Sequence, residues 1–394
     1  MQYDLPPSLP KPDATSAAHS ERVSAFIRER ICDAGGDISF AEYMQHALYA
    51  PGLGYYSAGA TKFGEQGDFI TAPEVSSVFG HIVARQCADV LKQINGGDIL
   101  EYGAGTGKLA VDILTCLAEL DALPSAYRIL EVSADLRERQ EQYVRQNAPD
   151  LAQLVTWVRV PLDPVRGVIV ANEVLDALPV ERFVRRDAGV QQQRVHAGHQ
   201  GFGFVESAAP EGLASSVENI EREIGEQLPD GYVSEVCIAL PDWIGQLSGS
   251  LHEGVVLLFD YGVSRREYYA RERSEGWLRC HFRHHAHNDP LIMPGIQDLT
   301  VWVDFTSVAA AAAEAGFDVA GYSNQAQFLM AGGLDEEMQD FGMLSLEMQL
   351  ELSRQIKTLT LPGEMGEHFK CMALRKGSSA TPSAFNLADR THTL

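Results

Sequence analysis

The sequence predicts an α/β fold in which a mostly parallel sheet is covered by helices on both faces. Short apolar runs alternate with amphipathic helical segments from residue 98 onward, which is the first sign of such a sheet. The second sign is a glycine-rich turn, Gly103 to Gly107, between the first run and the first helix. The third is the continuous apolar run 255–260, which is typical of a parallel strand buried on both faces.

The expected elements begin with helices. Ser20 has the position of a helix N-cap, Ser39 and Glu42 have the spacing of a capping box, and a third helix is expected over 73–94. The core elements are then expected in the order strand 99–102, helix 108–120, strand 128–131, helix 134–147, strands 155–158, 167–171 and 255–260, helix 308–315, and strands 317–321 and 369–374. In the insertion before the fifth core strand, the residue pattern predicts an antiparallel ribbon over 182–206 and a helix over 217–226.

This order divides the chain into a few expected parts. They are a disordered N-terminus (1–19), a helical cap and lid (20–95), a catalytic domain (96–376) with an insertion at about 180–250, and a disordered tail (377–394). Insertions at such a sheet edge commonly hold the second substrate.

The composition limits the class of protein. A chain of 394 residues with 45% hydrophobic content can bury a large core, and its net charge of -23 repels nucleic acid and anionic membranes. Neither is expected as a partner, and a cationic substrate fits better. The six cysteines are scattered without a C-x-x-C pair, and no apolar run approaches the ~20 residues of a membrane span. We therefore expect a cytoplasmic protein, either monomer or homodimer.

The spacing of the glycine turn selects the type of ligand. A phosphate-binding P-loop is excluded because Tyr102 and Leu109 occupy its required glycine and hydroxyl positions. The dinucleotide motif fits less well, since Lys108 stands in place of its third glycine, although that glycine is sometimes displaced. Glu101, just before the turn, would repel a pyrophosphate but attract the ammonium group of S-adenosyl-L-methionine (SAM). The alternative is that the glycines only form a tight turn.

Two further segments are candidates for cofactor contacts. Glu131 ends the next apolar run and could accept both hydroxyls of a ribose, a device that NAD-binding folds share. In the segment 67–74, Thr71 and Glu74 have the spacing of a capping box, so a purely structural role would account for this segment. Asp68 and Thr71 also lie where a lid over the glycine turn could begin, so a contact with the cofactor is the competing interpretation.

The segment 172–179 is the expected catalytic loop, because ligands of parallel sheets bind beyond the carboxyl ends of the strands. Glu173 and Asp176 could hold a planar guanidinium group and receive its proton as a methyl group arrives. For Asp176, a cap before Pro179 is an almost equal alternative. Asp304 is expected either to cap the following helix or to provide a second acidic contact to the acceptor.

The histidine-rich run 281–287 raises the question of a metal site. Zinc ligands usually show i, i+4 spacing on a helix or cysteine partners, and neither pattern is present in this run. We therefore expect polar packing in a loop, and no metal.

Several motifs together carry a resemblance to a known family. The segments 67–74, 101–109, 130–133, 172–179, 260–262, 280–291 and 294–305 resemble the MidA family of class I SAM-dependent methyltransferases. The resemblance implies a Rossmann-like class I sheet, mostly parallel with an antiparallel last strand, with an N-terminal helical cap and an inserted substrate-binding segment. This family includes a mitochondrial assembly factor of respiratory complex I that methylates an arginine of a core subunit.

The resemblance also implies roles for individual residues. Gly103, Gly105 and Gly107 would line the methionine part of SAM, Glu131 would hold the ribose, and Asn172 and Glu173 would face the transferred methyl group. The histidine run becomes a family loop. One departure concerns the glycine turn, where many members carry Pro-Gly-Arg and this chain has Ala104-Gly105-Thr106.

The implied function is methyl transfer from SAM to an arginine nitrogen of a protein partner, with a complex I subunit as one such partner. Two alternatives remain open on the sequence. One is a non-catalytic assembly or chaperone module that keeps the methyltransferase fold. The other is a NAD-dependent oxidoreductase, since the glycine turn and Glu131 are also compatible with that cofactor.

Overall fold

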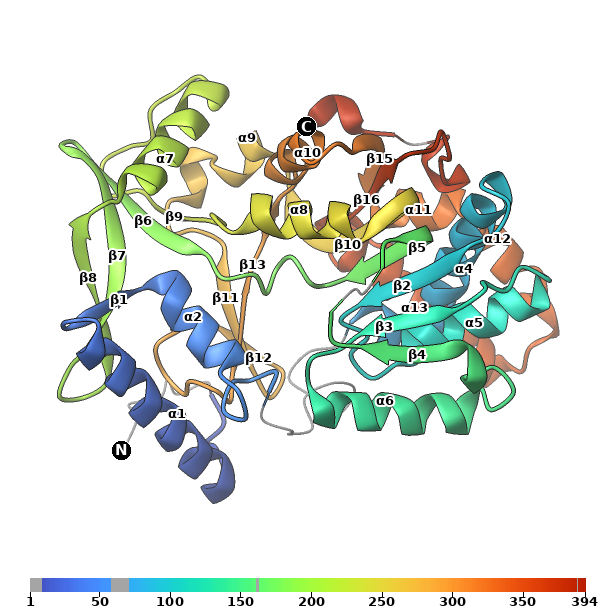
Figure 1. Ribbon diagram of the computed structural model, residues 1–394, viewed down its shortest axis with the longest axis horizontal. Coiled ribbons are helices and arrows are strands. Elements are labelled where there is room, and N and C mark those ends of the chain that lie inside the picture. The colour runs from blue at the N-terminus through green and yellow to red at the C-terminus, as the bar shows by residue number, and fades with distance from the viewer. Residues whose placement is uncertain (1–8, 58–70, 161–162, 388) are drawn as a thin grey trace. The chain divides into compact units, whose positions relative to one another are not determined.

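The chain is described here by a computed structural model that covers residues 9–57, 71–160, 163–387 and 389–394. It forms two compact units, each assembled from separate segments of the chain (Figure 1). Unit 1 comprises Met1–Phe69, Asp176–Leu240 and Ser264–Trp302, and unit 2 comprises Ile70–Leu175, Pro241–Val263 and Val303–Leu394. The N-terminal helices and the insertion, which are far apart in the sequence, thus belong to the same unit.

Unit 2 is built on the mainly parallel sheet that the sequence predicts. Its strands are β2 (Asp98–Tyr102), β3 (Tyr127–Leu130), β4 (Val155–Val158), β5 (Val165–Asn172), β10 (Leu251–Val263), β14 (Val303–Asp304), β15 (Asp318–Asn324) and β16 (Phe369–Lys376). They lie in the order β15-β16-β10-β5-β2-β3-β4, and β14 pairs with the end of β10. The pairs among β4, β3, β2, β5 and β10 are parallel, whereas β16 is antiparallel to both of its neighbours.

Both faces of this sheet are buried. Val168 and Val170 of β5 lie in the core cluster that also contains side chains of helices α4 and α5. Ile169, between them, points to the opposite face because side chains alternate along a strand, and it is buried as well. A strand with no solvated face needs apolar residues at every position, which explains the unbroken run in β10.

The helices of unit 2 connect these strands. They are α3 (Ala72–Val75), α4 (Ser77–Gln93), α5 (Lys108–Glu119), α6 (Ala134–Asn147), α8 (Leu240–Gly249), α10 (Phe305–Glu314), α11 (Gln325–Ala331), α12 (Leu334–Glu337), α13 (Leu346–Thr360) and α14 (Met365–His368), with short turns η1 (Ala152–Leu154), η3 (Phe341–Met343), η4 (Ser383–Phe385) and η5 (Thr391–Thr393). The single helix expected over 73–94 is divided at Ser76, whose hydroxyl accepts a hydrogen bond from Val78 N and starts α4 afresh.

The C-terminal segment differs from the expectation of a structureless tail. Within it, η4 places Phe385 in the core of unit 2, with its ring centroid 5.4 Å from that of Phe328. This packing depends on residues distant in sequence, so local polarity gave no sign of it. Among the described residues, no helix combines the length and the apolar character needed to cross a membrane.

Unit 1 contains two antiparallel sheets and several helices. The elements are α1 (Ala14–Asp33), β1 (Asp37–Ser39), α2 (Phe40–Tyr49), β6 (Glu181–Arg186), β7 (Gly189–Ala197), β8 (Phe202–Ala208), α7 (Glu211–Ile224), β9 (Val233–Val236), α9 (Arg265–Tyr268), η2 (Arg271–Arg273), β11 (Leu278–Phe282), β12 (His285–His287) and β13 (Asp298–Val301). One sheet has the order β1-β7-β6-β9 with β8 on β7, and the other has the order β12-β11-β13. The ribbon expected over 182–206 is thus confirmed.

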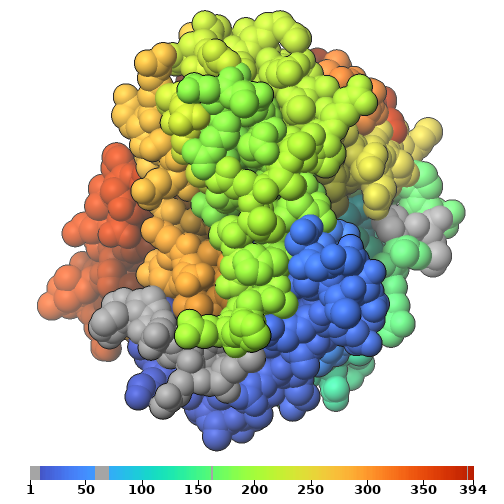
Figure 2. Space-filling model, turned by 90° about the vertical axis from the view of Figure 1, so that its left-hand side faces the viewer, coloured from blue at the N-terminus to red at the C-terminus, as the bar shows by residue number. Residues whose placement is uncertain are grey.

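The N-terminal helices pack on the larger sheet of unit 1. Figure 2 shows the insertion in green beside the N-terminal segment in blue, and β1 pairs with β7. The capping box of Ser39 and Glu42 is confirmed. The expected start of the first helix at Ser20 is wrong, because Asp13 accepts from Thr15 N and Ser16 N and begins α1 at Ala14.

Candidate functional site

The glycine turn follows β2 at the carboxyl edge of the unit 2 sheet. Gly103, Gly105 and Gly107 have φ values of 66°, 53° and 88°, in the left-handed region that favours glycine. A Cβ built on Gly105 would have no heavy atom within 4 Å, so its backbone is open on that side. Gly107 is the N-cap of α5 and directs the first amides of that helix toward the turn. The turn can therefore receive a ligand at close range.

A side chain in α3 holds this turn. Thr106 Oγ1 donates to Glu74 Oε1 at 2.5 Å. Thr71 occupies the N-cap position of α3, as the expected capping box requires. The capping box itself is wrong, because the side chain of Thr71 makes no hydrogen bond to the helix. Glu74 turns to Thr106 instead, so the segment that contains Thr71 does adjoin the glycine turn. Asp68 lies outside the described residues.

Glu131 ends β3 and is fixed by two donors. Its Oε1 accepts from Ser133 N at 2.7 Å, and its Oε2 accepts from Gln140 Nε2 at 3.1 Å. The same amide nitrogen donates to Gly105 O at 3.0 Å, while Gln140 Oε1 accepts from Trp157 Nε1 at 2.9 Å. Burial raises the pKa of Glu131, and these donors oppose the rise.

Gln140 therefore connects the acid expected to hold the ribose with the glycine turn. We did not identify Gln140 from the sequence. The available signal was that Gln140 is a polar residue on the inward-facing side of helix α6, where Val144 is also buried.

Glu101, expected to attract an ammonium group, lies inside the sheet layer. Its Oε2 accepts the hydroxyl of Tyr127 at 2.7 Å, and its side chain is buried. Burial raises the pKa of Glu101 to about 7, and the hydrogen bond from Tyr127 opposes that rise. The carboxyl group therefore titrates near neutral pH. Its contact with a ligand stays a prediction.

The loop after β5 presents Asn172 and Glu173. Glu173 has a φ of 53°, an uncommon value for a residue with a side chain, and its backbone N donates to Phe259 O at 2.8 Å. Asn172 Nδ2 donates to Glu173 Oε1 at 3.2 Å. Asn172 Oδ1 is buried and has no hydrogen-bond partner among the described residues. Such an atom normally finds a partner, so it is available to a bound ligand.

A buried aspartate holds this loop in place. Asp260, near the end of β10, has 1% of its surface exposed, and its Oδ2 accepts from Val174 N at 3.2 Å and Leu175 N at 2.9 Å. Its Oδ1 accepts from Tyr261 N at 3.0 Å. Asp260 is thus a positioning residue for the Glu173 loop. We assigned it no role from the sequence, although a carboxylate that ends an apolar strand was a usable signal.

The two loops lie together, because β2 and β5 are adjacent strands. A Cβ on Gly103 would stand 3.3 Å from Val174 Cγ2, one residue beyond Glu173. The structure therefore brings the glycine turn, Glu131 and the Asn172–Glu173 pair to one edge of unit 2.

Asp176 is placed in unit 1, beyond the unit boundary after Leu175. Its carbonyl oxygen accepts from Val301 N at 2.9 Å, and its side chain is buried. Burial and then the charge of Asp176 raise the pKa of Tyr49, whose hydroxyl donates to Ala177 O at 2.8 Å. The catalytic role expected for Asp176 stays a prediction.

Asp304 serves as the N-cap of α10. Its Oδ1 accepts from Thr306 N at 3.0 Å and Ser307 N at 3.2 Å, and its Oδ2 accepts from Ser307 Oγ at 2.7 Å. These bonds account for Asp304 as a helix cap, the first of the two expected roles. The acceptor contact stays a prediction.

The histidine run forms the hairpin of β11 and β12. Burial, together with the nearby charges of His287 and Arg279, lowers the pKa of His281 to about 4. Its ring is thus neutral at pH 7. Within the described ranges, no group of three or more histidine, cysteine, aspartate or glutamate side chains has a metal-binding arrangement.

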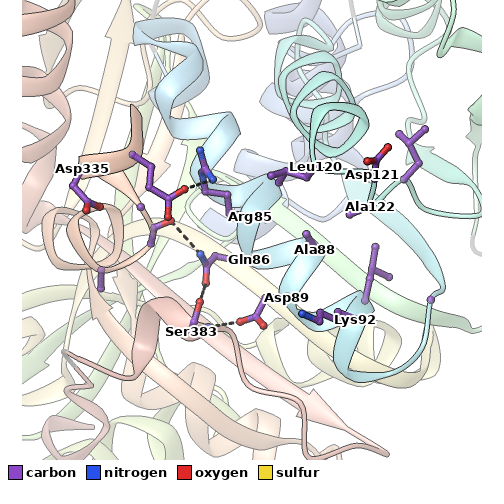
Figure 3. A pocket seen from close by; sticks show the side chains of 17 residues that line it. Arg85, Gln86, Ala88, Asp89, Lys92, Leu120, Asp121, Ala122, Asp335 and Ser383 are labelled. Carbon is purple, nitrogen blue, oxygen red and sulfur yellow. Dashed lines mark hydrogen bonds and ion pairs between the residues drawn. The ribbon is translucent and has the colours of Figure 1, made fainter. Parts of the chain in front are cut away.

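A cavity of about 650 Å³ lies elsewhere in unit 2 (Figure 3). It is lined by Gly96, which precedes β2, by Leu120 to Leu123, which precede β3, and by residues of α4. These loops are at the amino ends of the strands, opposite the glycine turn. The cavity is therefore separate from the candidate site.

The residues at the carboxyl edge fit SAM. The glycine turn is open at Gly105, the Glu131 carboxylate is fixed at the end of the neighbouring strand, and Asn172 Oδ1 is buried without a partner among the described residues. Ligands of doubly wound sheets bind where the strand order reverses, and that point lies between β2 and β5. Fold and site together define a class I methyltransferase.

Comparison with known families agrees with this class. Residues 82–323 match the family described as S-adenosyl-L-methionine-dependent methyltransferase, and the chain belongs to this family. It is 37% identical to a protein from Burkholderia thailandensis whose crystal structure contains S-adenosyl-homocysteine. That similarity has a TM-score of 0.92 and covers 98% of this chain and 100% of the other. The expected fold class and cofactor are confirmed.

Curated relatives include the protein arginine methyltransferase NDUFAF7 homolog of Drosophila melanogaster, 29% identical over 95% of this chain and 90% of the relative. Human NDUFAF7 is 29% identical over 86% of this chain and 80% of the relative. Both proteins are named mitochondrial. The expectation of a cytoplasmic location, drawn from the scattered cysteines and the absence of a membrane-spanning run, is contradicted by these relatives.

Proposed function

We propose that this chain transfers a methyl group from SAM to an arginine side chain of a protein partner, with Glu173 as the catalytic carboxylate. The observation that carries the proposal is the placement of Glu173 beside the glycine turn on a loop with left-handed backbone. Strain of this kind is concentrated at functional sites. The relatives named as protein arginine methyltransferases support arginine as the acceptor.

The chain's own residues account for the steps that an arginine acceptor requires. Bound SAM supplies an electrophilic methyl group. Glu173 would hold the guanidinium fork by charge-assisted hydrogen bonds and direct one nitrogen toward that methyl group. As the nitrogen–carbon bond forms and the sulfur–carbon bond breaks, Glu173 would take the proton that the nitrogen releases. Asn172 Nδ2 fixes the carboxylate oxygen that performs this step.

The other expected residues retain their proposed roles in cofactor binding. Glu131 would accept the ribose hydroxyls, since Ser133 N and Gln140 Nε2 already orient its two oxygens. The glycine turn would line the methionine part, and Glu101, Thr71 and Asn172 would complete the contacts.

The partner is proposed to be a subunit of respiratory complex I, as the resemblance to the MidA family implies. A cationic acceptor agrees with the net charge of -23, because a strongly acidic chain attracts basic segments.

The test measures SAM binding and methyl transfer separately in Glu173→Gln. We expect transfer from labelled SAM to a lysate protein to fall about 10²–10⁴-fold, because the proton acceptor is lost, while calorimetry shows unchanged SAM affinity. Glu138→Gln, an exposed acid on α6, is the matched control. Amino-acid analysis of the labelled product should give methylarginine.

Three results would contradict the proposal. Full transfer in Glu173→Gln would remove Glu173 from catalysis. Label on a residue other than arginine would remove the acceptor. Tight SAM binding with no transfer to any protein would indicate a non-catalytic assembly module.

A further inference from the structure

Exposed apolar side chains are concentrated at the start of α13 and in the turn before it. The exposed fractions are 88% for Met343, 72% for Leu346 and 63% for Leu350. Leu346 and Leu350 are four residues apart on α13 and so lie on one face of that helix, and Met343 ends the turn η3 just before it. Large apolar residues grouped in this way mark interaction sites more often than single exposed ones do.

The same segment is strongly acidic. Residues 334–352 contain no lysine, arginine or histidine, and their acids are Asp335, Glu336, Glu337, Asp340, Glu347 and Glu351. Asp340 and Glu347 are exposed beside the exposed apolar side chains. We call Asp340, Met343, Leu346, Glu347 and Leu350 the α13 surface. It combines apolar contact area with negative charge.

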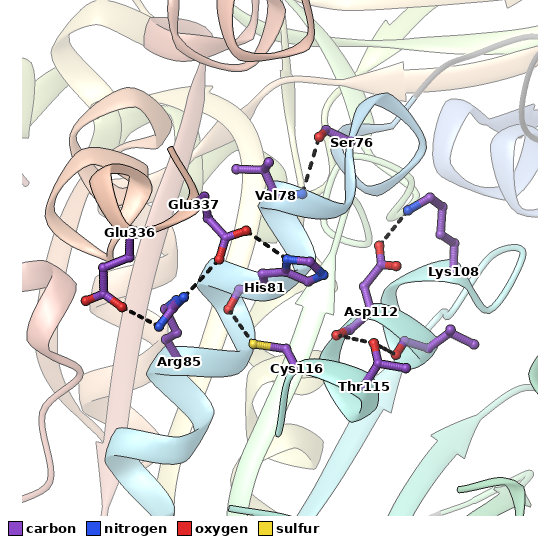
Figure 4. Close-up of polar contacts among 11 residues, drawn as sticks. Ser76, Val78, His81, Arg85, Lys108, Asp112, Thr115, Cys116, Glu336 and Glu337 are labelled. Carbon is purple, nitrogen blue, oxygen red and sulfur yellow. Dashed lines mark hydrogen bonds and ion pairs between the residues drawn. The ribbon is translucent and has the colours of Figure 1, made fainter. Parts of the chain in front are cut away.

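Ion pairs fasten α12, which precedes this surface, to α4 (Figure 4). Arg85 donates to Glu336 Oε2 at 2.5 Å and to Glu337 Oε1 at 3.0 Å. His81 Nδ1 lies 2.9 Å from Glu337 Oε2, and this bond raises the pKa of His81. At its other end, α13 buries Leu359 in the core. The α13 surface is thus held at both ends, and a partner would meet a preformed site.

The α13 surface is also connected to the cofactor turn within unit 2. Helix α13 packs against α3. Glu74 of α3 accepts the hydrogen bond from Thr106 in the glycine turn. A protein bound along α13 would therefore lie near the loop that is proposed to hold SAM.

We propose that the α13 surface docks a basic amphipathic segment of the protein that receives the methyl group. The exposed apolar side chains would contact apolar side chains of that segment, and Asp340 and Glu347 would pair with its lysine and arginine residues, whereas Glu336, Glu337 and Glu351 already pair with Arg85 and Arg354. Charge complementarity selects this occupant. The identification of the partner as methyl acceptor rests on the proposed function, whereas the docking itself does not.

The experiment uses the full chain and a fluorescent synthetic peptide of about five helical turns, with lysine and arginine on one face and leucine on the other. Fluorescence anisotropy should show binding that weakens with salt. In Leu346→Gln with Leu350→Gln we expect affinity to fall about tenfold or more, because apolar anchors carry most of the binding energy. Asp340→Asn with Glu347→Gln should reduce both affinity and its dependence on salt.

Met330→Gln, at an exposed apolar residue of α11, is the matched control and should bind the peptide as the unchanged chain does. Calorimetry with SAM should give the same affinity in all variants, so a failure of docking is distinguishable from a failure of SAM binding or transfer.

Three outcomes would overturn the proposal. The first is equal peptide affinity with and without Leu346 and Leu350. The second is equal affinity for a peptide with glutamate in place of its basic residues. The third is self-association of the chain in sedimentation that disappears in Leu346→Gln with Leu350→Gln, since a second copy would then cover the surface.

Discussion

Two loops leave adjacent strands at the carboxyl edge of unit 2 and enter the left-handed backbone region by different means. The turn after β2 uses glycines, with φ of 53° at Gly105, so this backbone conformation carries no penalty from a Cβ. The loop after β5 has the same φ at Glu173, which carries a side chain, and depends on hydrogen bonds accepted by Asp260. Glycine suffices where only backbone must approach a ligand, as proposed for the turn, whereas the strained backbone at Glu173 agrees with the chemical role proposed for its side chain.

The buried carboxylates next to these loops differ in a similar way. Asp260 accepts from three backbone nitrogens, at Val174, Leu175 and Tyr261. Glu101 accepts a hydrogen bond from the hydroxyl of Tyr127, and burial raises its pKa to about 7. Asp260 therefore organises backbone, while Glu101 remains a group that titrates near neutral pH.

The largest effect is expected for Asp260→Ala. Three buried backbone N–H groups would lose their acceptor, so the free energy of unfolding should fall by about 3–5 kcal/mol in urea titrations. Methyl transfer should be lost in the fraction that folds. Asp304→Ala, which removes only the N-cap of α10, should cost about 1 kcal/mol. Equal losses in the two variants would show that Asp260 does not brace the loop.

Glu101→Gln should change how stability depends on pH. The folded pKa of about 7 lies above the ordinary value of 4.5, so the stability that Glu101 contributes is present below pH 4.5 and is lost as the pH rises through 7. Glutamine cannot ionise, so the variant should gain about 2–4 kcal/mol over the unchanged chain at pH 8 and about 1 kcal/mol at pH 5. Urea unfolding at both values measures this difference, and parallel curves would contradict the prediction.

Gly105→Ala should affect both stability and SAM binding. The left-handed conformation costs a residue with a Cβ about 1–2 kcal/mol, even though the space around Gly105 is open. The added methyl group would occupy the face proposed to receive SAM. Calorimetry should therefore show that the affinity for SAM falls by about tenfold or more. Gly212→Ala, at a helical glycine with open space and no positive φ, is the control. Unchanged SAM affinity would move the ligand away from this turn.

The smallest effect on stability is expected for Glu173→Gly, and it is a gain. Glycine adopts the local φ without strain, which should stabilise the folded state. Because glycine also raises the conformational entropy of the unfolded chain, thermal unfolding should show a net gain of about 1 kcal/mol or slightly less. Transfer should be lost as in Glu173→Gln. A destabilised variant would show that the Glu173 side chain contributes to folding as well as to catalysis.

Much of unit 2 could be predicted because its information is local. Apolar runs such as 255–260 and the glycine turn each identify a strand or a loop without reference to distant residues. The break of the helix at Ser76 was missed because the periodicity of apolar residues continues across it. The burial of Phe385 was missed because its partner, Phe328, lies far away in the sequence.

The candidate site divides in the same way. Gly105, Glu131 and Glu173 were identified because each directly follows or ends a predicted strand, where ligands of a parallel sheet bind. Gln140 and Asp260 were not assigned, because their roles consist of hydrogen bonds to other loops. Asp176 belongs to unit 1, and its catalytic role stays a prediction.

The strand order of unit 2 has a consequence for how the chain is made on the ribosome. β5 pairs with β2 on one side and β10 on the other, yet the whole insertion is synthesised before β10 appears. Until then, β5 presents an apolar edge that other nascent chains could join. β16 fits between β10 and β15 last of all, so truncation before Phe369 would leave β15 without a paired strand and β10 open on the side away from β5.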